Sequence, residues 1–266
     1  MHSILALLRH DALTAASYRL NSVLSLLSLA VTTVPLYLVT DALQPLMEGP
    51  IDGEGDRFFA FVLVGIVALR WATVGATALP GAVSGAIRQG RLETLLLAPV
   101  PLPMLLAGMI AYQLAWVMVE SVVVIGAGLL LGVRLAWAGV PWVLPVLVLI
   151  TLAYTGIGLV AATLQLRFRT SGPLLNGTIV VSVLLGGVYY PTSVVPSWIA
   201  GVADAVPLVY GLRALRGMLL EGTPPAAAAG DLGVLAMITV ALLAASGLAF
   251  DAALRQSRRA GTLAQY

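Results

Sequence analysis

Long apolar runs recur from one end of this chain to the other, and they restrict the folds open to it. Several runs reach 18 residues or more with almost no charged side chain, the length at which a helix crosses the hydrocarbon core of a bilayer. Only 10% of the 266 residues are charged, whereas soluble domains carry about 25%. The sequence therefore predicts an all-α integral membrane protein, with residues 1–266 forming a single transmembrane domain.

Six of these runs are predicted to span the membrane. Each has at least the roughly 20 residues that a span needs, except the fifth, which is close to the lower limit. The predicted spans are residues 21–41, 58–80, 103–132, 142–164, 173–190 and 232–254.

The positions of the arginines orient these spans. All 14 basic residues are arginine, and with the N-terminus in the cytoplasm nine of them lie in inner segments. Four lie in outer segments: Arg57, Arg134, Arg213 and Arg216. This asymmetry satisfies the positive-inside rule. We therefore expect both termini to lie in the cytoplasm. The expected location is a bacterial inner membrane, which the chain crosses several times.

The segment before the first span, residues 1–19, is predicted to form an interfacial helix. Ile4, Leu7 and Leu8 share one helical face, while Arg9 begins the polar side. Such a helix lies along the surface of the inner leaflet with its apolar face in the lipid. A frayed cytoplasmic tail is the alternative.

Two residue types that the chain lacks limit its chemistry. Because there is no lysine, the chain cannot form a P-loop of the type GxxxxGK[ST]. Because there is no cysteine, it has no disulfide, thiolate metal site or cysteine nucleophile. We find no Ser–His–Asp or paired-carboxylate arrangement for catalysis, and we expect no enzyme activity, metal or cofactor in this chain. The acidic cluster Asp52, Glu54 and Asp56 is the sole candidate for an enzyme site, and its glycines are more typical of a solvated turn.

The loop between the second and third spans is predicted to contain a short amphipathic helix at residues 84–98. Three leucines fall on one helical face, and three charged residues supply polar contacts. These residues are Leu92, Leu95 and Leu96, and Arg88, Arg91 and Glu93. Prolines at 99, 101 and 103 then stop the helix before the third span. An ordinary loop whose arginines only set the topology is the alternative.

Two charged residues lie near the middle of predicted spans. Arg70 is in the second span and Glu120 is in the antiparallel third span. An ionisable side chain at that depth costs about 2.5–3.5 kcal/mol on insertion scales, so it is expected to be paired or to face a wet cavity. We predict an Arg70–Glu120 ion pair. Its role is either to hold the two spans in register or to line a transport pathway. The remaining polar span residues are expected first of all to link helices; they are Gln113, Tyr154, Gln165 and Asn176.

The segment after the fifth span is broken by Pro191, Pro196 and Pro207, yet it is too apolar for a solvated loop. Two helical pieces, about 196–205 and 207–220, can form a re-entrant hairpin across residues 191–222. Backbone of this kind survives at membrane depth only when protein or a wet cavity covers it. Aromatic side chains suited to the membrane interface accompany the hairpin; they are Tyr189, Tyr190 and Trp198.

This segment resembles the signature of the type-2 ATP-binding-cassette export permeases. Members of that family pair G-G-x-[FY]-[FY]-P with P-x-W, followed by P-L-x-Y and L-R. The matching residues are Gly186, Gly187, Tyr189, Tyr190, Pro191, Pro196, Trp198, Pro207, Leu208, Tyr210 and Arg213. The six-span layout, the interfacial helix and the charged first inner loop also fit, so the resemblance covers essentially the full chain.

The resemblance implies an exporter subunit without its own nucleotide site. Two permease copies or homologues would associate in the lipid, and a separate cytoplasmic ATPase dimer would bind ATP and Mg²⁺ and drive them. The 84–98 segment would be the coupling helix that docks on this ATPase. The cargo would be a hydrophobic or amphipathic compound, such as a drug, a lipid or a lipid-linked glycan. No nucleic acid partner is expected.

An ATP-independent secondary transporter or scramblase is the alternative. That class predicts inverted repeats with helices broken at matching positions in the two halves. The sequence has its one broken segment late in the chain, at residues 186–222.

Overall fold

A computed structural model describes residues 19–47, 57–88, 102–168, 172–191 and 197–259, and these parts of the chain are helical without any strand. The long helices are α2 (Arg19–Met47), α3 (Phe58–Arg88), α5 (Leu102–Leu130), α6 (Val140–Phe168) and α10 (Ala229–Arg259). The shorter ones are the 3₁₀ helix η1 (Trp137–Gly139), α7 (Gly172–Leu185), α8 (Ser197–Ala203), α9 (Pro207–Arg216) and the π-helix η3 (Gly217–Glu221).

Five helices within the described residues are long and apolar enough to cross a membrane. They correspond to the first, second, third, fourth and last predicted spans. The predicted fifth span, 173–190, differs because its helix α7 has 14 residues and ends at Leu185. That length rises only about 21 Å. The chain then turns through Gly187, whose φ of 75° is a left-handed conformation that glycine adopts without strain.

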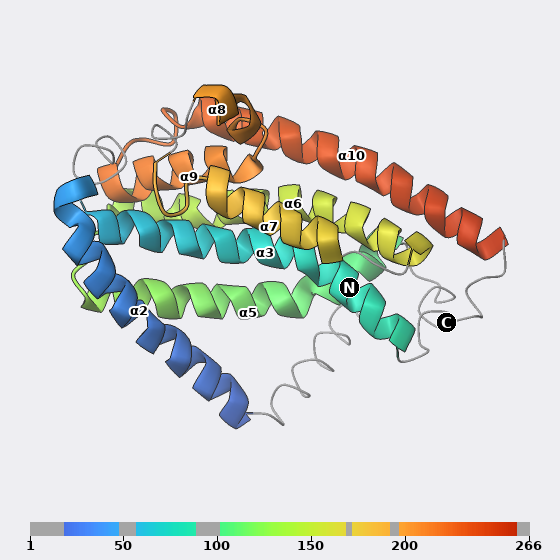
Figure 1. The fold of residues 1–266 in the computed structure, drawn as a ribbon, viewed down its shortest axis with the longest axis horizontal. Helices are drawn as coiled ribbons and strands as arrows, with labels where there is room; N and C mark the ends of the chain where they lie inside the picture. The colour runs from blue at the N-terminus through green and yellow to red at the C-terminus, as the bar shows by residue number, and fades with distance from the viewer. Residues whose placement is uncertain (1–18, 48–56, 89–101, 169–171, 192–196, 260–266) are drawn as a thin grey trace.

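Helix α3 is the most enclosed of the five long helices, and α6 packs against both α3 and α10 (Figure 1). Glycines permit the close approach of α3 and α6. A Cβ atom on Gly75 would lie 2.5 Å from the Thr151 carbonyl oxygen, and one on Gly158 would lie 2.6 Å from the Ala76 carbonyl oxygen. Membrane helices commonly use small residues for such contacts. The α3–α6 pair is therefore the closely packed centre of the bundle.

Helix α9 and the following η3 run antiparallel along the first half of α6. Gly211 packs against Ile150, and further along the Ala136 amide donates a 2.7 Å hydrogen bond to the Leu219 carbonyl oxygen. Pro207, the first residue of α9, therefore lies near the middle of α6, where it shares a groove with Tyr154. The two helical pieces predicted at 196–205 and 207–220 match α8 and α9–η3 in position.

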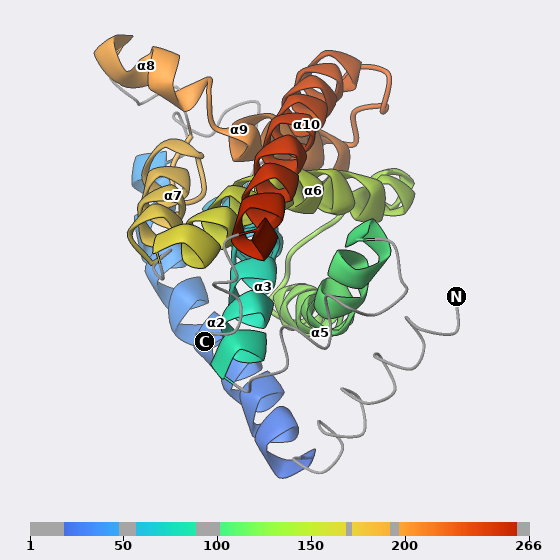
Figure 2. The same ribbon diagram turned by 90° about the vertical axis from the view of Figure 1, so that its right-hand side faces the viewer.

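The outer helices keep large apolar side chains exposed. On α2 they include Val23, Leu27, Val31 and Leu38, and on α10 they include Met237, Val240 and Leu248. Figure 2 shows α2 and α10 on different sides of the α3–α6 centre. Apolar surface of this extent is expected where a chain contacts lipid or another subunit.

Several predicted features lie outside the described residues. They include the interfacial helix before Arg19, the acidic cluster at 52–56, Pro196, and the coupling residues Arg91, Leu92, Glu93, Leu95 and Leu96. The predicted start of the coupling helix needs a correction. Helix α3 continues through Pro80 to Arg88, so residues 84–88 belong to α3 and not to a separate helix. A proline is tolerated there because neighbouring helices can satisfy the freed backbone groups.

Candidate functional site

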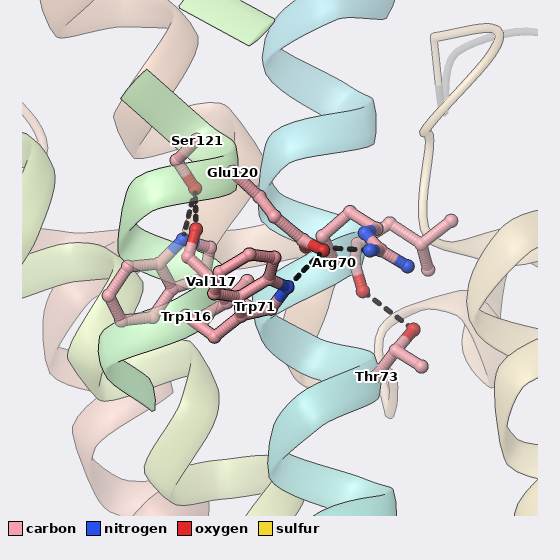
Figure 3. Close-up of polar contacts among 8 residues, drawn as sticks. Arg70, Trp71, Thr73, Trp116, Val117, Glu120 and Ser121 are labelled. Carbon is pink, nitrogen blue, oxygen red and sulfur yellow. Dashed lines mark hydrogen bonds and ion pairs between the residues drawn. The ribbon is translucent and has the colours of Figure 1, made fainter. Parts of the chain in front are cut away.

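The mid-span charges Arg70 and Glu120 meet between α3 and α5 (Figure 3). The Arg70 Nη2 and Glu120 Oε2 atoms are 2.6 Å apart and form a charge-assisted hydrogen bond. The predicted ion pair is therefore present. It joins residues 50 positions apart in the sequence, because α3 and α5 are antiparallel neighbours.

The two members of this pair are unequally enclosed. The Glu120 side chain is 12% exposed, and its second oxygen accepts a 2.9 Å hydrogen bond from Trp116 Nε1, one helical turn earlier on α5. The Arg70 side chain is 47% exposed. Glu120 is thus held on two sides, while the guanidinium remains accessible from outside the bundle.

A second polar contact already fixes the register of α3 against α5. Trp71 Nε1 donates a 2.7 Å hydrogen bond to Ser121 Oγ, and both side chains are buried. The Ser121 hydroxyl donates in turn to the Val117 carbonyl oxygen at 2.7 Å. This contact lies one residue from the ion pair on each helix and is better shielded. The register of the two helices therefore does not depend on Arg70 and Glu120 alone.

Between Phe58 and Pro80, the residues of α3 that are not buried form a single strip along the helix. We name it the open strip of α3; it consists of Ile66, Leu69, Arg70, Thr73, Val74 and Thr77. Figure 3 shows Arg70 and Thr73 on the same side of α3. The Thr73 and Thr77 hydroxyls donate to the carbonyl oxygens of Leu69 and Thr73, at 2.8 Å and 2.7 Å. On α5, the half-buried Gln113 lies two turns before Glu120 and so on the same face.

A further arginine is enclosed at a position where the sequence predicted an outer segment. Arg216, on α9, is 2% exposed. Its guanidinium carbon lies 3.3 Å from the ring centroid of Phe61 on α3. Its Nη2 donates to the carbonyl oxygens of Gly187, Phe61 and Val188, at 2.7, 3.2 and 3.2 Å. Arg216 therefore joins α9, α3 and the turn after α7.

The hairpin residues of the sequence signature have mostly local contacts. The Tyr210 hydroxyl donates to the Asp204 carbonyl oxygen at 2.8 Å, and the Tyr190 hydroxyl donates to the Leu184 carbonyl oxygen. Arg213 lies 5.5 Å from the Tyr210 ring centroid and 3.4 Å from Asp231 Oδ1. Of the other described members, Tyr189 and Trp198 are exposed, and the buried ones are Gly186, Gly187, Pro191, Pro207 and Leu208.

A groove of about 360 Å³ lies where α6 and α7 meet the chain between α8 and α9. Its lining is mainly apolar and includes Val181, Val202 and Pro207. Tyr154 and Ser182, also in its lining, share a 2.5 Å hydrogen bond between their hydroxyls. The Ser182 hydroxyl donates to the Thr178 carbonyl oxygen at 2.7 Å, so Tyr154 is the donor to Ser182. As expected for Tyr154, the contact links two helices.

No group of three His, Asp or Glu side chains gathers as a metal site would require in the part of the chain that the structure describes. The arrangement instead offers one half-exposed cation at mid-span and a polar strip beside it.

A family comparison decides the class of protein. The family model described as ABC-2 type transporter matches residues 15–220, which include every described helix except α10 and the end of η3. The chain belongs to the ABC-2 type transporter family. Among curated proteins, no sequence matches it. As a member of this family, the ABC-2 type permease is the multi-pass, membrane-spanning part of a transporter.

Proposed function

We propose that this ABC-2 type permease is the membrane subunit of an exporter that moves a hydrophobic or amphipathic compound out of the cytoplasm. A second permease copy or homologue completes the pathway, and a separate ATPase dimer supplies the energy. The observation that carries this proposal is the family match over residues 15–220 of a chain with no lysine for a P-loop. ATP and Mg²⁺ are bound by the partner ATPase.

The arrangement of the helix ends supports the proposed orientation. Helices α3, α6 and α10 end on the same side of the bundle, opposite the segment that joins α5 to α6 (Figure 1). Five arginines lie near those three ends: Arg88, Arg167, Arg255, Arg258 and Arg259. We assign this end to the cytoplasm by the positive-inside rule.

Helix α3 provides a direct mechanical route from the ATPase to the pathway. It carries Arg70 at mid-span and continues without interruption to Arg88, where the proposed coupling segment begins. When the ATPase displaces residues 89–98, α3 transmits this movement towards Arg70 as a rigid rod, because α3 packs along α6. A conformational shift requires a partner that prefers one state, and the ATP-bound ATPase dimer is that partner.

The α8–α9 pair is proposed to be a re-entrant hairpin of the outer leaflet. If α6 crosses the membrane, Pro207 near its middle places the start of α9 at mid-membrane depth. Burial of α9 against α3, α6 and α10 supplies the protein cover that such a segment requires.

Copurification tests the proposal. After mild solubilisation of cells that express the tagged permease, an ATPase subunit should copurify, and the reconstituted complex should export cargo only when ATP is present. In the same complex, Glu93→Arg or Leu92→Trp should leave membrane insertion and ATP hydrolysis intact and abolish export. A permease that transports without ATP and never associates with an ATPase would overturn the proposal.

A further inference from the structure

In the Arg70–Glu120 pair the cation is exposed and the anion is largely enclosed. Glu120 is 12% exposed and accepts hydrogen bonds from both Arg70 and Trp116. Arg70 is 47% exposed, and in the described part of the chain its one polar contact is the bond from Nη2 to Glu120. A guanidinium carries five N–H donors in a planar fork. Most of these donors therefore remain available on the open side of α3.

The position of this cation excludes lipid tails as its surroundings. Arg70 lies about midway along α3, one of the five helices that can span a membrane. It is too far from either end to reach the headgroup region readily, and a charge that faces hydrocarbon at mid-span is strongly unfavourable. The neighbouring threonines of the open strip, Thr73 and Thr77, extend the polar surface along the helix. The open strip therefore faces a polar space, which the second permease copy closes from the lipid.

We propose that Arg70 binds the anionic head group of an amphiphilic cargo, with a phosphate as the best-fitting group. This inference rests on the proposed function and names its substrate class. A phosphate accepts two parallel N–H bonds from a guanidinium, and the geometry left open by Glu120 permits this. Glu120 positions Arg70 from the α5 side and partly neutralises its charge. Because of this partial neutralisation, Arg70 binds the anionic head group weakly enough to release it again. The apolar members of the open strip, Ile66, Leu69 and Val74, provide contact surface for the alkyl part of the cargo.

Photolabelling of the purified full-length permease in phosphatidylcholine nanodiscs tests this proposal. The two probes are dodecyl phosphate and dodecanol, each with a diazirine in the alkyl chain, and the labelled peptides are mapped by mass spectrometry. The phosphate probe should label residues 66–77 and 113–124 more strongly than the alcohol does. Excess unlabelled dodecyl phosphate should suppress that labelling. Equal labelling by both probes would overturn the proposal.

Substitutions at the two members of the pair should act in opposite directions. Arg70→Gln should reduce labelling by the phosphate probe about tenfold or more, because a charge-assisted hydrogen bond is lost. Arg70→Lys, which keeps the charge, should stay within about threefold of the parent. Glu120→Gln should retain or increase labelling, because Arg70 is no longer neutralised. The control Arg57→Gln, at another exposed arginine next to α3, should leave labelling unchanged.

The outcomes separate a binding role from a structural one. If Arg70→Gln and Glu120→Gln both abolish labelling, the pair only supports packing and the proposal fails. If Arg70→Gln does not fold, labelling of Arg70→Lys and Glu120→Gln still decides whether the pair binds the phosphate probe or only supports packing. Inorganic phosphate that competes as well as dodecyl phosphate at equal concentration would show a site for free anions and would overturn the assignment of an amphiphile. No ATPase is present, so a negative result leaves the copurification test unaffected, and failed copurification leaves this result standing.

Discussion

Two arginines within the helix bundle have contrasting surroundings. Arg216 is 2% exposed, stacks on the Phe61 ring and donates to three backbone carbonyl oxygens. Arg70 is 47% exposed, and its partner is the carboxylate of Glu120. The first joins three parts of the chain and has little surface left for a ligand. Among the described residues, the second makes one polar contact and keeps most of its donors accessible.

The contrast indicates which charge serves the fold and which serves transport. A buried cation that satisfies carbonyl oxygens replaces backbone hydrogen bonds that the turn after α7 cannot make for itself. A half-exposed cation at mid-span has no comparable structural reason, particularly when the buried Trp71–Ser121 contact already links α3 to α5. We therefore expect the stability of the fold to depend on Arg216 and the binding of the cargo to depend on Arg70.

The largest effect is expected from Arg216→Met. This change leaves the buried carbonyl oxygens of Gly187 and Val188, which lie in the turn after α7, without the donor they share, at a cost of about 1–3 kcal/mol for each. The Phe61 carbonyl oxygen keeps its partner in the helix α3. The free energy of unfolding should fall by about 2–6 kcal/mol, measured by denaturant titration in mixed micelles. Arg216→Lys should recover part of the loss, since an ammonium donates but cannot stack as a plane. A Met variant within about 1 kcal/mol of the parent would contradict a structural role for Arg216.

A smaller effect is expected where α3 meets the turn that Arg216 holds. A Cβ atom on Gly65 would lie 2.4 Å from the Val188 carbonyl oxygen and 3.2 Å from Arg216 Nη2. Gly65→Ala should therefore destabilise the protein by about 1–3 kcal/mol, as overpacking does. The matched control is Gly85→Ala on the same helix, where a Cβ atom meets nothing within 4 Å. It should be neutral or stabilising, by up to about 1 kcal/mol. Equal thermal unfolding midpoints for the two variants would show that this contact is not tight.

Arg70→Gln is expected to change stability little. A half-exposed ion pair contributes about 0–1 kcal/mol, and the Trp71–Ser121 contact remains. The unfolding free energy should therefore fall by less than about 1 kcal/mol, although ATP-driven export of dodecyl phosphate is lost. A loss of stability as large as that of Arg216→Met would remove the distinction between the two arginines.

The smallest effect is expected from Trp116→Phe. This change removes the 2.9 Å hydrogen bond to Glu120 Oε1 and keeps an aromatic ring in place. Hydrogen bonds between membrane helices average about 0.6 kcal/mol, and a bond within one helix should contribute no more. Photolabelling by the phosphate probe should change by about threefold or less, because Arg70 still contacts Glu120. A tenfold loss would mean that Trp116, and not Arg70, positions the cargo.

The sequence alone located the long helices and the ion pair, for reasons of local composition. An apolar run of 20 residues can hardly be anything but a span, and a charge in the middle of each of two antiparallel spans requires a partner. The end of α7 was predicted too late, at 190, because no charged residue marks the end of the run and Gly186 and Gly187 are compatible with a membrane helix. Its true end at Leu185 depends on the left-handed turn at Gly187.

Arg216 could not be predicted in the same way. It lies three residues after Arg213, in a segment that the sequence assigns to the outer side of the membrane. Three of its partners are backbone carbonyl oxygens, which every residue has, so the sequence does not reveal them. One of them belongs to Phe61, 155 residues away. The unequal exposure of Arg70 and Glu120 could not be predicted either, because the enclosure of Glu120 comes from the packing of α5 and from Trp116.

The accessibility of the open strip to water tests the central claim most directly. The chain has no cysteine, so single-cysteine variants need no further change. Thr73→Cys lies one turn after Arg70 on the open strip, and Val122→Cys replaces a residue of α5 that is 66% exposed and apolar. With permease and ATPase reconstituted in liposomes, a water-soluble methanethiosulfonate should modify Thr73→Cys and spare Val122→Cys, because thiolates form in water and not in lipid. An unreactive Thr73→Cys together with a reactive Val122→Cys would contradict the account.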